Sequence, residues 1–340
     1  MTSALLRTRK IPWLRLLLGL LAGAIGLWLI TRDLELSDIE QAFLEAKPGY
    51  ILLAALVILV TILAKTWRWQ LLFINNGRPL TKDTPHPGSP TGSPAFSALF
   101  WPLILGQFIN TISPVRVGDL ARVVTLERET GIDKVQGLST LVVEKTLDII
   151  TLVMTLFLIL PTVVLPETIS LARRGMLMAA VAVTLLVLLL IFAYYRERIT
   201  TLAGRLIKRL PDRLQRPLLR LIVAGLTGLS ALRQPRQLLV LLFASIVIML
   251  LSILTPYILF STFDIPLGLK EAILLHLTLI LGQIPASTPG NVGIFEGLVV
   301  FILNQFGLTN NAAILSYAIV YHLVVVTPQI VLGSLSVIRK

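Results

Sequence analysis

The sequence contains no cysteine, so disulfide bonds, thiolate catalysis and cysteine metal sites are excluded. Charge is also scarce, because charged residues make up 14% of the chain and hydrophobic residues 55%. The mean hydropathy is +0.85. A soluble domain rarely has this composition, and several apolar runs of about twenty residues predict an all-α polytopic membrane protein.

Familiar catalytic motifs are absent as well, since the chain has no Walker motif, no HExxH and no GxSxG. The longest polar segment, 196–237, is too short for a catalytic domain. It is basic and amphipathic, which favours helices lying on the inner membrane surface, with a solvated linker as the alternative. We therefore expect no enzymatic activity and no cofactor.

The net charge of +12 would suit a nucleic-acid partner, but the cations collect between the apolar runs. That distribution is typical of cytoplasmic loops facing anionic lipid, so we expect lipid partners and no nucleic acid. The apolar runs fall at about 11–30, 50–72, 96–112, 135–160, 175–195, 238–262, 270–306 and 312–338. The first run has a basic start like a secretory signal, but its length favours a retained span.

Loop charges assign the sides of the membrane. The loop after the second run, to which we assign Lys65 and Arg68, is basic and contains a Pro/Gly/Ser linker at 80–94. The basic loop 196–236 is also cytoplasmic, which places 116–134 on the same side as 80–94. The segment between those two cannot cross the membrane and must enter and leave from the cytoplasmic face.

The same reasoning places positions 264 and 311 both outside, so the segment between them must also turn back. We predict a single domain, 1–340, in the cell membrane, with about six full spans and two re-entrant helical hairpins. Both termini are then cytoplasmic. The hairpins enter from opposite faces, and each precedes a full span, which makes the arrangement an inverted repeat.

The helices of both hairpins break within similar sequence segments, LGQFINTISPVRVGDL at 105–120 and LGQIPASTPGNVGIFE at 281–296. Non-helical backbone at membrane depth is tolerated only where protein buries it or where it lines a wet cavity. We therefore expect the two breaks to meet near the midplane and to form a substrate site. The alternative is an interfacial loop and an ordinary helix break, since proline and glycine are common in membrane helices.

The run 135–160 carries Glu144, Lys145 and Asp148, and Glu144 would lie roughly 14 Å deep at 1.5 Å per residue. Each such charge costs about 2.5–3.5 kcal/mol at the bilayer centre, so the three must face protein or water. Glu144 and Asp148 share one helix face. A neutral amide is cheaper to bury than a carboxylate, so Glu144→Gln should keep or raise stability.

The candidate partners of these charges are Arg116 and Arg122, with Asp119 between them on one side of the half-helix that leaves the first break. They would bind substrate. The alternative is a buried ion-pair network that only holds the hairpin against the next span, and the two roles can coexist.

In the second hairpin, Gly290 and Gly293 allow close backbone approach at a helix N-terminus that attracts anions. Glu296 either complements the helix dipole or has a functional role. His322, like His276, is either a cavity residue or a hydrogen-bonded packing residue. The predicted cavity lining is Gln107, Asn110, Gln283, Tyr317, Tyr321 and His322.

These motifs, R-x-G-D-x-x-R, E-K-x-x-D and P-G-x-x-G-x-x-E, resemble the transmembrane region of lysylphosphatidylglycerol synthetases, a flippase-like family, over nearly the whole chain. The resemblance implies a lipid translocator, with lysyl transfer belonging to a separate soluble domain. Asn291 and Val292 depart mildly from the residues common there. The implied site residues are Arg116, Gly118, Asp119, Arg122, Glu144, Lys145, Asp148, Pro289, Gly290, Gly293 and Glu296.

The favoured function is translocation of an anionic or aminoacylated phospholipid, or of a polyprenyl-phosphate-type lipid. Arg116 and Arg122 would hold the phosphate, and the glycine turns would add backbone donors. The alternatives are an intramembrane enzyme acting on lipid-linked substrates and a membrane scaffold for a separate lipid-modifying enzyme. The absence of a nucleophile motif weighs against the enzyme.

Overall fold

The computed structural model describes residues 36–73, 94–113, 117–159, 194–207, 235–283 and 288–339, and the isolated positions 21, 184, 191 and 215. The predicted spans 11–30 and 175–195, apart from a few positions, and nearly all of the linker 80–94 lie outside these residues. Every regular element within the described ranges is a helix, which confirms the all-α class. In chain order they are α2 (Leu36–Glu45), α3 (Pro48–Leu71), α4 (Phe96–Ile112), α5 (Gly118–Thr130), α6 (Lys134–Ile159), α8 (Arg196–Ile207), α10 (Pro235–Phe260), α11 (Leu269–Gly282), the 3₁₀ turn η3 (Pro289–Asn291), α12 (Ile294–Gln305) and α13 (Asn311–Ile338).

Three helices of the described chain, α3, α10 and α13, are long and apolar enough to cross a membrane. The shorter α4 is apolar too. Helix α6 matches the predicted span 135–160 in length, but its buried polar and charged residues lower its hydropathy. The protein is therefore a helical membrane protein, and the full span count remains a prediction.

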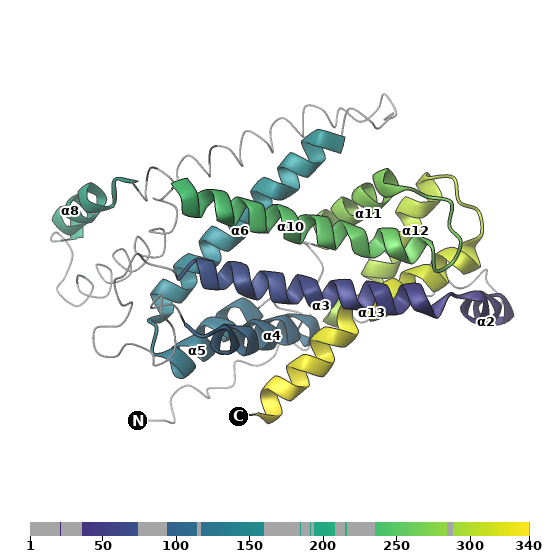
Figure 1. The fold of residues 1–340 in the computed structure, drawn as a ribbon, viewed down its shortest axis with the longest axis horizontal. Coiled ribbons are helices and arrows are strands. Elements are labelled where there is room, and N and C mark those ends of the chain that lie inside the picture. The colour runs from purple at the N-terminus through teal and green to yellow at the C-terminus, as the bar shows by residue number, and fades with distance from the viewer. Residues whose placement is uncertain are drawn as a thin grey trace.

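Helices α3 and α10 run antiparallel, side by side, along the long axis of the molecule (Figure 1). At one end the Lys47 backbone N–H, just before α3, donates to the Thr262 carbonyl at 3.0 Å. At the other end the Gln237 amide donates to the Leu71 carbonyl at 2.7 Å. These contacts fix which ends of the two helices are neighbours, so they give a reference for the hairpins.

Helices α4 and α5 form a hairpin whose two ends lie at the Leu71 end of α3. The Gln70 amide donates to the Pro94 carbonyl, just before α4, at 2.9 Å. Beyond α5, Ile132 is buried in the same apolar cluster as Leu72 and Phe73. The chain therefore enters and leaves this hairpin at one end of the bundle.

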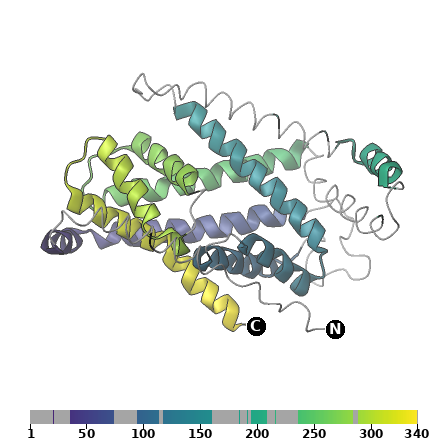
Figure 2. The same cartoon turned by 180° about the vertical axis from the view of Figure 1, so that it is seen from behind.

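Helices α11 and α12 form a second hairpin at the opposite, Pro48 end of α3, the end at which α2 also lies (Figures 1 and 2). Before α11, Asp264 forms an ion pair with Lys47 at 2.5 Å. After α12, Leu308 packs against the same apolar cluster as Phe263. The two hairpins therefore point toward each other, which is the geometry that the inverted-repeat prediction requires; their placement in a membrane stays a prediction.

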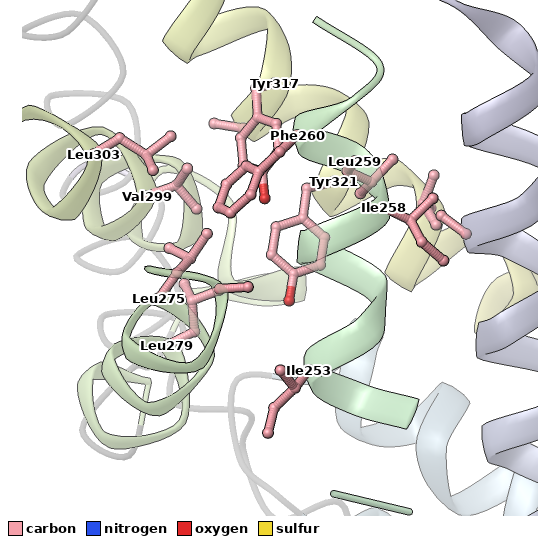
Figure 3. Close-up of a cluster of buried hydrophobic side chains, with 14 of the residues drawn as sticks. Ile253, Ile258, Leu259, Phe260, Leu275, Leu279, Val299, Leu303, Tyr317 and Tyr321 are labelled. Atoms are coloured by element: carbon pink, nitrogen blue, oxygen red, sulfur yellow. The ribbon is translucent and has the colours of Figure 1, made fainter. Parts of the chain in front are cut away.

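The core beside the second hairpin is apolar and includes Tyr317 of α13 (Figure 3). The Tyr317 ring stacks on Phe260, with 5.3 Å between ring centroids. Its hydroxyl donates to the Pro256 carbonyl of α10 at 3.1 Å. Tyr317 thus ties α13 to α10 inside the core, which differs from the cavity position expected from the sequence.

Candidate functional site

The first hairpin turns tightly because its arms touch through glycine. A Cβ atom on Gly118 would lie 1.9 Å from the Gly106 carbonyl oxygen, so no other residue fits there without moving backbone. The Asn110 side-chain oxygen accepts from the Gly118 backbone N–H at 2.7 Å and closes the turn. The predicted Arg116 lies outside the described residues.

The second hairpin turns through three residues with left-handed backbone, Gly290 (φ 64°), Asn291 (φ 58°) and Gly293 (φ 82°). Glycine adopts this conformation freely, and asparagine is the next most tolerant residue. The Asn291 amide donates to the Gln283 side-chain oxygen at 2.8 Å, which joins the turn to the end of α11. Asn291 therefore serves the turn geometry.

His322 and Glu296 hold this second turn in place. One ring nitrogen of His322 lies 2.5 Å from the Glu296 carboxylate, and the other lies 2.7 Å from the Gly290 carbonyl. The ring of His322 therefore bridges the Glu296 carboxylate of α12 and the backbone of the turn. The other Glu296 oxygen accepts from the Gly293 N–H at 2.7 Å. Glu296 and His322 thus form a clamp on the turn. Glu296 lies in the first turn of α12, and His322 is hydrogen-bonded, so both have the structural role that the sequence left open beside a functional one.

The two tips meet at a cavity of about 230 Å³, which we call the tip cavity. Gly290 contacts the first hairpin here, because a Cβ on it would lie 3.8 Å from the Thr111 carbonyl oxygen. The lining includes six residues predicted from the sequence: Asn110, Asp119, Lys145, Gln283, Gly290 and His322. The two similar segments, 105–120 and 281–296, therefore meet at one polar cavity.

A second cavity of about 330 Å³ adjoins the tip cavity. The two share Gln283, Phe295, Val325 and Gln329 in their walls. Gln107 and Gln283, the glutamines of the two Leu-Gly-Gln motifs, both line the second cavity, as does Tyr321. The two similar segments thus place equivalent glutamine side chains in the wall of one cavity, although these side chains lie on helices from opposite ends of the bundle.

Of the four charged residues of α6, Glu144 and Asp148 belong to one ion-pair network, in which Glu144 is buried and Asp148 is partly exposed. Arg122 of α5 pairs with Glu144 through both carboxylate oxygens. Arg68 of α3 pairs with Asp148 at 2.7 Å and approaches Glu144 at 3.8 Å. The Arg122 guanidinium also lies over the Trp69 ring, 4.4 Å from its centroid. Arg122, Glu144 and Asp148 line neither cavity, so the network holds α3, α5 and α6 together.

Lys145 is the α6 charge that faces the tip cavity. It lies about 100° around the helix from Glu144, and so it points away from the arginine network. Its ammonium group lies 3.6 Å from the Asp119 carboxylate, and both side chains are partly exposed. Lys145 and Asp119 are the residues of opposite charge that a substrate in the tip cavity would meet.

The sequence placed Lys65 and Arg68 in a loop, and that assignment is wrong. Both lie within α3, and Arg68 is almost fully buried. Their spacing of three residues put them on one helix face, which was the available signal. Among the remaining predicted site residues, Gly118, Pro289 and Gly293 shape the two turns and do not line the tip cavity.

Two helical hairpins that meet at a polar, charged cavity among apolar helices define a helical membrane protein with an internal polar cavity. The family model of the lysylphosphatidylglycerol synthase TM region matches residues 16–333, so the chain belongs to this family. This finding confirms the resemblance seen in the sequence and indicates a role connected with membrane lipids. The comparison with curated proteins gives no match.

Proposed function

We propose that the protein translocates a lipid with a phosphate headgroup between membrane leaflets. The substrate class is an anionic or aminoacylated phospholipid or a polyprenyl-phosphate-type lipid. The observation that supports this most is the tip cavity, where hairpins from opposite ends of the bundle meet beside Lys145, Asp119 and His322. A site reached by hairpins from both ends suits alternating access from the two leaflets.

Each charged group of the tip cavity has a role in this proposal. Lys145 donates hydrogen bonds to oxygen atoms of the headgroup, and Asp119 accepts hydrogen bonds from an amine or hydroxyl group of the headgroup. The clamp formed by His322 and Glu296 keeps the turn at Gly290 in shape. Arg122, which the sequence suggested as a phosphate ligand, acts instead through Glu144 as a positioning residue.

The proposal also includes an orientation in the cell membrane, with both termini cytoplasmic and the first hairpin entering from that side. The chain has no cysteine. Single cysteines at exposed Lys134 and Asp264 should therefore react with an impermeant thiol reagent from opposite faces, Lys134→Cys from the cytoplasmic one. Labelling of both from one face contradicts the orientation.

The test of translocation uses purified protein in liposomes containing fluorescent phosphatidylglycerol or lysylphosphatidylglycerol, with a membrane-impermeant quencher reporting leaflet exchange. Lys145→Met should lower the rate about tenfold or more, because a hydrogen bond to a charged group contributes about 1.5–3 kcal/mol. Lys134→Met is the matched control, since Lys134 is also half-exposed on α6 and pairs with Glu127 at 2.8 Å. It should leave the rate unchanged.

The same liposomes separate the competing functions. Equal rates for the Lys145 and Lys134 variants would contradict a substrate role for Lys145. Chemical conversion of the labelled lipid, detected by chromatography, would indicate an intramembrane enzyme. Neither exchange nor conversion by the wild-type protein would favour a scaffold that serves a separate lipid-modifying enzyme.

A further inference from the structure

Lys65 of α3 faces the second cavity and has no partner there. It lies one helical turn before Arg68, and its side chain is half-buried. It forms no hydrogen bond and no ion pair with any residue that the structure describes. Its position among α3, α10, α11 and α13 places the ammonium group in the interior of the bundle.

The carboxylates of the neighbouring helices α5 and α6 that the site contains are already paired with other cations. Glu144 pairs with Arg122, Asp148 with Arg68, and Asp119 with Lys145, as described above. Asp148 and Glu144 attract Lys65, whereas Arg68 and Lys145 repel it. No aspartate or glutamate is among the described residues that line the second cavity. The charge of Lys65 is therefore left over in the centre of the bundle, where an unbalanced charge is costly.

The walls around Lys65 add further donors. His276 of α11 lies within electrostatic range of Lys65 and makes no hydrogen bond with a described residue. Gln329 accepts from the Thr111 hydroxyl at 2.6 Å through its side-chain oxygen, which leaves its amide hydrogens to donate. Gln107 contributes a second amide. An ammonium group, an imidazole and two amides together suit a ligand that has only acceptors and a negative charge.

We propose that the second cavity binds a phosphate-type anion at Lys65, and that this anion is the phosphodiester of the translocated lipid. The assignment to a lipid rests on the proposed function, whereas the anion site rests on the Lys65 cavity alone. The lipid would then extend past Gln283 and Gln329, with its phosphate at Lys65 and its polar headgroup at Asp119 and Lys145. A free phosphate ion has the same chemistry, so the experiment must separate the two sources.

The test measures the thermal stability of detergent-purified protein against increasing inorganic phosphate and glycerophosphoglycerol. The wild type and Lys65→Arg should be stabilised, and Lys65→Met should lose about tenfold or more in apparent affinity for both anions. Lys270→Met, at an exposed lysine of α11, is the control and should bind like the wild type. Without anion, Lys65→Met should be at least as stable as the wild type, because an unpaired charge has been removed.

Phosphatidylglycerol in phosphatidylcholine nanodiscs should then displace a labelled glycerophosphoglycerol probe from the wild type. Anion binding that phosphatidylglycerol does not displace would overturn the lipid assignment in favour of a soluble anion. Unchanged anion affinity in Lys65→Met, with lower stability in the absence of anion, would overturn the site and make Lys65 a member of the arginine network. Lys65-dependent binding by a wild-type protein that moves no lipid would instead contradict the proposed function.

Discussion

The two hairpins share a plan but are held by different forces. In the first, α4 and α5 touch backbone to backbone at Gly106 and Gly118, and Arg122 fastens α5 to α6 by a buried ion pair. In the second, Gly282 of α11 meets the Leu298 side chain of α12, and the turn is held from α13 by the clamp of Glu296 and His322.

The difference follows from the composition of the returning helices. Helix α5, GDLARVVTLERET, is polar and cannot be held by apolar packing alone, so charge pairing anchors it. Helix α12, IFEGLVVFILNQ, is apolar and buries Phe295, Val299 and Leu303 against the core. Similar turns can therefore be stabilised by electrostatics in one place and by packing in another, and the two should respond differently to substitution.

The largest expected effect comes from breaking the charge anchor of the first hairpin. Arg122→Gln leaves the buried Glu144 with only the more distant Arg68, and removing one partner of a buried pair typically costs about 3–5 kcal/mol. Glu296→Gln in the second hairpin keeps a side-chain oxygen for Gly293 and should cost about 1–3 kcal/mol. Denaturant unfolding in micelles measures both, and equal losses would contradict the contrast between the hairpins.

A smaller effect is expected at the glycines where the arms touch. Gly118→Ala places a methyl group against the fixed Gly106 carbonyl and should cost about 1–3 kcal/mol or more, with a wider separation of the arms. Gly282→Ala meets the Leu298 methyl groups at 2.6 Å and 2.8 Å, and that side chain can rotate, so the loss should be below that of Gly118→Ala.

Thermal unfolding of both alanine variants gives the comparison. Gly49→Ala is the control, because a Cβ there meets nothing within 4 Å and alanine favours the helix. A Gly282 variant that is less stable than the Gly118 variant would show that the second hairpin is the tighter of the two.

The smallest effect is expected at Asn291. Asn291→Gly loses the hydrogen bond to Gln283 but adopts φ 58° freely, so the net change should stay within about 1 kcal/mol. Asn291→Ala loses the same bond and adds left-handed strain of roughly 1–2 kcal/mol. Stability of the alanine variant equal to that of the glycine variant would show that the backbone here relaxes out of the left-handed region.

The sequence predicted the parts of the site that depend on backbone breaks. The repeated Leu-Gly-Gln motifs and the glycine turns located both tips, because proline and glycine break helices through local backbone effects that can be read from the sequence. Lys145 was found because charges inside an apolar run are expensive wherever the helix packs. Asp119 was found because it lies between Arg116 and Arg122 on the half-helix that follows the first break.

The partners of those charges could not be predicted, because pairing depends on how distant helices pack. Arg68 lies near the end of an apolar run and resembles a loop cation, yet it is 1% exposed and bonds to Ser245 at 2.9 Å. Arg68 and Arg122 both contact the Glu144 carboxylate. The sequence-based expectation that the Glu144→Gln protein keeps or gains stability is therefore revised. The variant should lose stability, because two arginines would share a neutral amide.

The contact between Gly106 and Gly118 also has a mechanical consequence. Two backbones in direct contact leave no side chain that could rotate to let one arm slide past the other, and the Asn110 bond joins them again at the turn. We therefore expect α4 and α5 to travel as one rigid piece in any transport cycle. The second hairpin would be the one that bends, because the rotatable Leu298 separates its arms. The tip cavity would then open and close from the Pro48 end of the bundle.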